Sequence, residues 1–126
     1  MPDDEPNFSI PQRPTRRYPG RGGVEYDGGT VFHLTPDPRR DDRSLTDLVE
    51  SVLEGRRYRY GDWFDLPMPL YLVHDDETDD TFRVAVREGT VRLYVLPETE
   101  RGGLRAFYDR LTAVDDADWA VECRPE

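Results

Sequence analysis

The sequence predicts a two-layer α+β domain, in which a mainly antiparallel sheet of about five to six strands carries two helices on one face. Three observations predict it. One stretch repeats apolar residues at helical spacing, two later stretches alternate apolar and polar residues as strands do, and a second helical stretch follows them. We expect this domain to span residues 24–126, preceded by a disordered, flexible Pro/Arg/Gly-rich arm over residues 1–23.

The arm is predicted from its composition. Residues 1–23 hold five of the eleven prolines and few large apolar side chains, too few to offset the entropy lost on ordering the chain. Its arginines and a tyrosine could pair with phosphates and stack on bases, which makes the arm a candidate nucleic-acid contact. Its acidic residues and the net charge of -10 of the whole chain argue against that contact. The candidate residues are Arg13, Arg16, Arg17, Tyr18 and Arg21.

The first expected strands surround a pair of glycines. Tyr26 precedes Gly28 and Gly29, and Val31 and Phe32 follow them. Glycine adopts the positive φ that tight hairpin turns require, so the pattern predicts a first hairpin.

The first helix is the clearest element of the chain. Ser44 is the expected N-cap and Gly55 the expected end. Between them, apolar residues at helical spacing share one face: Leu45, Leu48, Val49, Val52 and Leu53.

A three-stranded meander is expected next, over residues 70–73, 81–86 and 90–96, because apolar residues alternate with arginine in the last two stretches. A second helix should run from Thr99 or Gly103 to Ala113, and a final strand over residues 119–123 should join the sheet. One face of such a sheet packs on the helices, while the other stays exposed or contacts a partner.

The charge balance is unusual. All 17 basic residues are arginine and 27 residues are acidic. This composition is similar to that of proteins from extremely salt-loving archaea, whose carboxylates hold water in molar KCl; a GC-rich genome is the alternative source of so much arginine. No apolar run reaches the roughly 18 residues of a membrane span, and one cysteine forms no internal disulfide. We therefore expect a small acidic cytoplasmic protein that does not enter a membrane.

Residues 54–64 form the strongest candidate partner surface, because Arg, Tyr and Trp are enriched at binding hot spots. The competing interpretation, which we weigh more heavily, is a strand whose aromatic side chains enter the core and whose arginines pair with aspartates such as Asp62 and Asp65. The candidate contact residues are Arg57, Tyr58, Arg59, Tyr60 and Trp63.

Other motifs indicate little chemistry. The acidic run at residues 74–80 lacks the spacing of a calcium loop, and His33 and His74 lack zinc-ligand spacing, so neither predicts a metal site. Cys123 is expected to be an inert buried thiol. The run at residues 101–105 weakly resembles a phosphate-binding glycine loop.

No arrangement of residues singles out a catalytic, cofactor or metal site. The sequence therefore favours a non-catalytic protein-binding module. We expect it to bind its partner through the exposed sheet face and through residues 57–63. Two alternatives stay open: a nucleic-acid-associated accessory protein that uses the arginine arm, and a small enzyme with an unidentified carboxylate site. The oligomeric state is not predicted.

Overall fold

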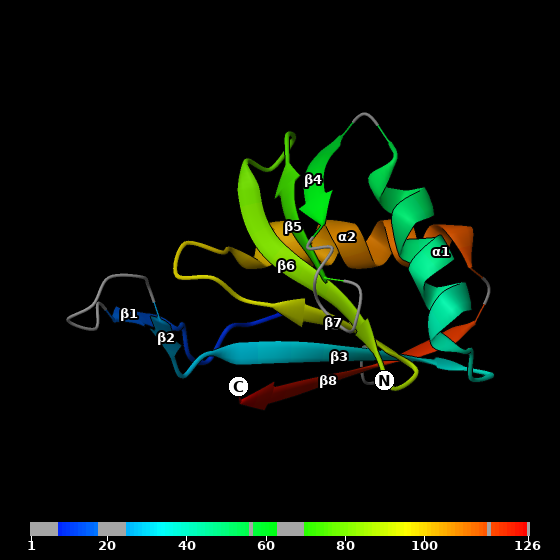
Figure 1. The fold of residues 1–126 in the computed structure, drawn as a ribbon, viewed down its shortest axis with the longest axis horizontal. Coiled ribbons are helices and arrows are strands. Elements are labelled where there is room, and N and C mark those ends of the chain that lie inside the picture. Colours follow the sequence, from blue (N-terminus) through cyan, green and yellow to red (C-terminus); the bar gives the residue numbers. More distant parts are fainter. Residues whose placement is uncertain (1–7, 18–24, 56, 63–69, 116, 126) are drawn as a thin grey trace, which may run out of the picture.

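The computed structural model describes residues 8–17, 25–55, 57–62, 70–115 and 117–125. It shows two helices packed against one face of a six-stranded antiparallel sheet (Figure 1), so the predicted fold class is confirmed. Neither helix in this part of the chain has the length and apolar character needed to cross a membrane.

The main sheet has the strand order β4-β5-β6-β7-β3-β8, and every neighbouring pair is antiparallel. Two short strands form a separate sheet. The elements, in chain order, are β1 (Thr15–Arg17), β2 (Glu25–Asp27), β3 (Thr30–Asp37), α1 (Asp42–Leu53), β4 (Tyr58–Asp62), β5 (Leu70–Asp75), β6 (Asp80–Arg87), β7 (Thr90–Tyr94), α2 (Arg101–Val114) and β8 (Asp118–Pro125).

The predicted first hairpin is wrong. β2 pairs with β1, whereas β3 pairs with β7 and β8. Gly28 and Gly29 do adopt positive φ values of 71° and 117°, but they join two different sheets instead of two paired strands. The turn chemistry was visible in the sequence, while the distant partners of β3 were not.

The first helix confirms its predicted apolar face and corrects its predicted cap. Asp41 is the N-cap, and its carboxylate accepts a hydrogen bond from the Ser44 amide at 2.8 Å. Leu48 is partly buried, and the other four members of the predicted face are buried: Leu45, Val49, Val52 and Leu53.

The meander, the second helix and the last strand all form, as predicted. β5, β6 and β7 pair in sequence order, and β8 lies at one edge of the sheet beside β3. The turn between β6 and β7 uses Glu88 and Gly89, whose φ values are 54° and 75°. Because β4 pairs with β5, the segment from residue 58 to 62 is a strand at the opposite edge.

The core lies between the sheet and the two helices. Phe107 of α2 packs edge to face against Phe82 of β6 and Tyr58 of β4, with ring centroids 5.8 and 6.1 Å apart. α1 and α2 also contact each other and β6. This arrangement buries the apolar side of β3, β5, β6 and β7, whereas the edge strand β8 has no fully buried residue. The opposite side of the sheet has no helix layer (Figure 1).

Residues 8–17 correct the prediction of a flexible arm for the part of it that the structure describes. Phe8 is 2% exposed, and its ring packs against Phe32 of β3 and Tyr108 of α2. Ile10 packs on the same core. The Thr30 hydroxyl also donates a hydrogen bond to the Gln12 carbonyl at 2.6 Å. The amino-acid composition of this segment did not reveal these contacts with the domain. Residues 1–7 and 18–23 lie outside the described residues, so the boundary at residue 23 stays a prediction for them.

Candidate partner-binding surfaces

The predicted contact residues at β4 do not form one surface. Tyr58 is 6% exposed and belongs to the core, and Tyr60, on the same side of the strand, is 40% exposed with its ring 5.8 Å from that of Tyr71. Arg59 points to the opposite side of the sheet and is 76% exposed. Trp63 lies outside the described residues. The role of this segment in partner binding therefore stays a prediction, with Arg59 and Tyr60 as its exposed members.

The arginines of this segment pair with the acidic turn between β5 and β6. Arg57 Nε donates to Asp75 Oδ1 at 2.8 Å, and Arg57 Nη1 donates to Glu77 Oε2 at 2.9 Å. Arg59 donates to Asp76 Oδ1 at 2.7 and 2.9 Å. The arginines thus pair with Asp75 and Asp76. The side chain of the predicted partner Asp62 and the whole of Asp65 lie outside what the structure describes. Antiparallel pairing of β4 with β5 brings the strand and the turn together.

Asp75 organises this corner of the fold. Burial alone would raise the pKa of its carboxyl, but hydrogen bonds from Arg57, the Glu77 amide and Thr78 outweigh burial and hold the pKa below 3.8. Its Oδ2 atom and the Tyr58 hydroxyl are buried and have no hydrogen-bond partner among the described residues. Burial first, and then the Asp75 charge, raises the pKa of Tyr58 to about 12.

The acidic run at residues 74–80 forms ion pairs within the domain. Its carboxylates pair with arginines, and His74 Nε2 lies 3.3 Å from Asp79 Oδ1. In the part of the chain that the structure describes, no group of three or more His, Cys, Asp or Glu side chains could hold a metal ion.

The glycine run at the start of α2 binds a carboxylate of this same chain. Asp80 of β6 is 4% exposed, and its oxygens accept hydrogen bonds from the Glu100 and Gly103 amides at 3.0 to 3.1 Å. A Cβ atom on Gly103 would come within 2.6 Å of Asp80 Cβ, so glycine is required for this approach. Burial raises the pKa of the Asp80 carboxyl, and the amide hydrogen bonds oppose that rise. The resemblance to a phosphate loop is therefore explained by an internal helix cap.

The structure describes the Arg13 side chain and the strand that contains Arg16 and Arg17 in the predicted nucleic-acid arm. The Arg13 guanidinium hydrogen-bonds the carbonyls of Pro97 and Thr99 and lies 3.3 Å from Glu100 Oε2. Arg16 and Arg17 belong to β1. Tyr18 and Arg21 lie outside the described residues. One of the candidate arm arginines thus fastens the N-terminal segment to the loop before α2.

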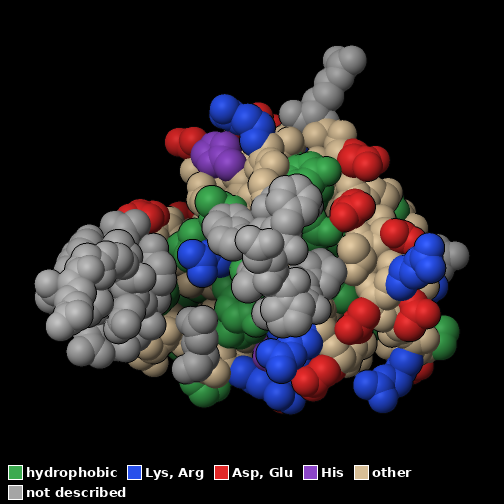
Figure 2. All heavy atoms as spheres, viewed as in Figure 1, with side chains coloured by type: hydrophobic (Ala, Val, Ile, Leu, Met, Phe, Trp, Pro, Cys, Tyr) green, Lys and Arg blue, Asp and Glu red, His purple; other side chains and the backbone are tan. Residues whose placement is uncertain are grey.

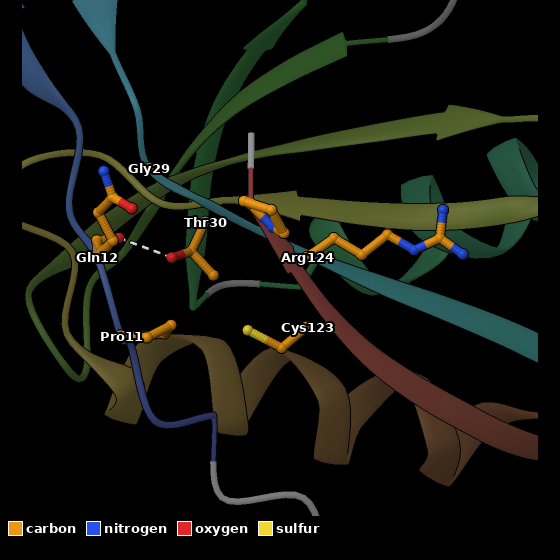
Figure 3. A pocket seen from close by; sticks show the side chains of 7 residues that line it. Pro11, Gln12, Gly29, Thr30, Cys123 and Arg124 are labelled. Atoms are coloured by element: carbon orange, nitrogen blue, oxygen red, sulfur yellow. Dashed lines mark hydrogen bonds between the residues drawn. The ribbon is translucent and has the colours of Figure 1, made fainter.

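Cys123 corrects another prediction, because it is exposed. It lies on the edge strand β8, where no further strand covers it, and lines a hollow of about 190 Å³ together with Pro11, Gln12 and Arg124 (Figure 3). Burial of the sulfur raises the pKa of the thiol, which reduces its thiolate fraction at neutral pH. Its apolar neighbours in the sequence suggested burial, and the position of the strand at an edge overrides them.

The side of the sheet away from the helices is the face that the sequence predicts to be exposed or to contact a partner. We call it the outer face and define it by two rows of opposed residues that cross β6, β7, β3 and β8. The first row is Arg83, Tyr94, Val31 and Arg124, and the second is Ala85, Arg92, His33 and Glu122.

The outer face is positively charged in an acidic protein. Its two rows contain three arginines and one glutamate, although the chain as a whole carries a net charge of -10. In Figure 2, which looks onto this face, basic side chains gather over the lower strands, and acidic side chains gather on the right, over α1. The outer face thus contrasts with the acidic helix α1, whereas α2 carries three arginines and one aspartate.

The positive charge of the outer face affects the pKa of His33. Burial and then the nearby Arg92 and Arg124 lower the pKa of His33 below 6.5, and Glu122 opposes them. The Arg92 side chain is only 16% exposed, so its aliphatic stem lies along the sheet while its charge remains on the outer face. The alternation of arginine with apolar residues in the sequence is the pattern that predicts this exposed face, while the neighbours of these arginines on β3 and β8 depend on strand pairing.

Comparison of the chain with protein-family models, with curated proteins and with solved structures finds no match.

Proposed function

We propose that the protein is a non-catalytic protein-binding module whose outer face recognises an acidic segment of a partner protein. The observation that carries the proposal is the concentration of Arg83, Arg92 and Arg124 on one face of a chain with a net charge of -10. Guanidinium groups bind carboxylates through paired hydrogen bonds. Tyr94, which lies between the arginines and is partly exposed, adds apolar contact area.

The same face supports an acidic protein segment better than a nucleic acid. A single-stranded nucleic acid is usually held by several aromatic side chains on which bases stack, and Tyr94 is the aromatic residue of the two described rows. At the low salt of the binding test below, the acidic helix α1 and the overall negative charge also repel a long polyanion. A short acidic peptide avoids most of that repulsion because it covers the outer face alone.

The test compares two probes and matched arginine variants. We expect a deca-glutamate peptide to bind the wild-type protein, and Arg83→Gln or Arg92→Gln to weaken that binding about tenfold, a typical effect for the loss of one charged contact. Arg105→Gln is the control, because Arg105 lies on α2 and pairs with Asp109 at 3.0 Å. Affinity is measured by isothermal titration calorimetry at the lowest KCl concentration at which the protein is folded.

Two results would overturn the proposal. Equal loss of peptide affinity in the Arg105 control would mean that total charge, not the outer face, governs binding. Tighter binding of a single-stranded RNA of similar length, weakened by the same outer-face variants, would assign the surface to nucleic acid instead.

We also propose that the protein works in the cytoplasm of a salt-loving cell. The support is compositional: acidic residues outnumber basic ones by 27 to 17, and lysine is absent. At about 1 M salt the Debye length is near 3 Å, so the repulsion among surface carboxylates is screened. Circular dichroism across a KCl series should show the fold strengthening toward molar salt, and a protein fully folded and equally stable in dilute buffer would contradict this.

A further inference from the structure

The two edges of the main sheet differ in how well they are suited to pairing. β4, at one edge, has five residues and includes Gly61, whereas β8, at the other, has eight. Among the described strands β8 pairs with β3 alone, and it forms the lower margin of the molecule in Figure 1. Its outward edge therefore presents backbone N–H and C=O groups that another strand could pair with.

The side chains of β8 specify a partner strand. Glu122 and Arg124 both lie on the outer face, with 60% and 55% of their side chains exposed, and Arg124 Nη2 lies 2.6 Å from Glu122 Oε1. Charged residues of one sign on an edge strand block pairing. Glu122 and Arg124 have opposite charges and lie on either side of Cys123. When two copies of this segment run antiparallel, the glutamate of each copy can therefore lie opposite the arginine of the other.

We propose that β8 pairs with β8 of a second copy of this chain, in an antiparallel register centred on Cys123. In this register Glu122 lies opposite Arg124 of the other copy, and the reverse pair forms by symmetry. Cross-strand pairs of opposite charge stabilise a sheet, and like charges destabilise it. The two-fold axis runs perpendicular to the sheet, so the helices of both copies cover the same side of a continuous twelve-stranded sheet.

Other symmetric registers lack this match. Centring the pair on Glu122 places that residue opposite itself, and centring it on Arg124 opposes two arginines. Centring it on Val121 places Asp118 opposite Arg124 but leaves Glu122 opposite Ala120, so cross-linking through Cys123 is the experiment that separates this register from the proposed one. The register centred on Cys123 is the one that places Glu122 and Arg124 opposite each other. The inference is independent of the acidic-partner proposal, and it would join two outer faces into one longer surface.

The register is tested by charge exchange in the full-length protein. We expect the wild-type chain to form a dimer in sedimentation equilibrium, and Glu122→Arg or Arg124→Glu to weaken the dimer at least about tenfold. The double variant, with both changes, restores the two cross-strand pairs and should recover the dimer. Arg59→Glu, on the opposite edge strand, is the control and should leave dimerisation unchanged.

Cysteine cross-linking tests the centre of the register separately. Directly opposed residues of an antiparallel pair have Cα atoms about 4.5 to 5.5 Å apart, a distance that a disulfide spans. Oxidation by dioxygen with a copper catalyst should therefore join two chains through Cys123. In a Cys123→Ser background, Ala120→Cys should not cross-link, because the two introduced thiols would lie about 20 Å apart along the strands.

The proposal is overturned if the wild-type protein stays monomeric at concentrations up to about 1 mM, because its self-affinity would then be negligible. It is also overturned if the double charge exchange fails to recover the dimer while each variant remains folded by circular dichroism. Formation of assemblies larger than a dimer, if Arg59→Glu abolished them, would show that β8 of one copy pairs with β4 of another instead.

Discussion

The two faces of one sheet differ in this protein: one holds the core, and we propose that the other binds a partner. On β6 and β7, Phe82, Val84 and Leu93 face the helices and are fully buried. Their neighbours Arg83 and Arg92 face the other way and carry the positive charge of the outer face. Because successive strand residues point to opposite sides, a single alternating pattern encodes a core and a charged surface together. Substitutions on the two faces should therefore affect different properties.

The largest expected effect is on the helix-covered face. Phe107→Ala should lower the free energy of unfolding by about 3–5 kcal/mol, because it removes a fully buried ring that contacts two other aromatic rings. Phe107→Leu, which keeps most of the volume, should lose less. Denaturant unfolding followed by circular dichroism measures both. A loss below about 1 kcal/mol for the alanine variant would place this ring outside the core.

Alkaline pH should reveal the buried Tyr58 hydroxyl. The pKa of Tyr58 is about 12 in the folded protein, against an ordinary value of 10.0. Between these two pH values the folded state keeps the phenolic proton and the unfolded state loses it. Stability is therefore fully present below pH 10 and declines as the pH rises toward 12, by up to about 3 kcal/mol from this group. Tyr58→Phe should remove this part of the decline. Identical pH profiles for the two proteins would contradict the burial of this hydroxyl.

The two adjacent glycines of α2 should respond in opposite directions. Gly103→Ala pushes a methyl group against Asp80 and should cost about 2 kcal/mol through the disturbed helix cap. Gly102 has open space around its missing side chain, so Gly102→Ala should be neutral or stabilise by up to about 1 kcal/mol. Thermal unfolding of the pair tests this contrast, and equal effects would contradict the capping role of Asp80.

The smallest expected change in stability is on the outer face. Arg92→Gln should alter the free energy of unfolding by less than about 1 kcal/mol. It should also raise the pKa of His33 toward 6.5, since Arg92 helps to lower it, while burial keeps it below that value. The stability tied to neutral His33 is present above pH 6.5 and is lost as the pH falls through the lowered pKa. NMR titration of His33 checks the shift, and no change would mean that Arg92 is too distant to act.

Local patterns predicted most of the fold. The apolar spacing of α1 and the alternation in β6 and β7 each depend on residues close in sequence, and the structure confirms them. The partners of β3 were missed because its pairing with β7 and β8 links segments about 60 and 90 residues away, and no local turn records that pairing.

The candidate sites were less predictable for the same reason. Arg57 pairs with Asp75 across two strands, and Asp80 caps a helix that begins 21 residues later. The burial of Phe8 depends on contacts with β3 and α2. Charge composition showed an acidic chain, but the gathering of arginines on one face follows from strand register, which was available only after the strands had been ordered.

The most direct test of the outer face as a binding surface is an NMR titration of the isotope-labelled protein with deca-glutamate. The predicted result is a set of amide shift changes concentrated at Arg83, Arg92 and Val31, together with a rise in the pKa of His33 as carboxylates approach it. Shift changes concentrated on α1 and α2, or an unchanged His33 pKa at saturation, would contradict the account.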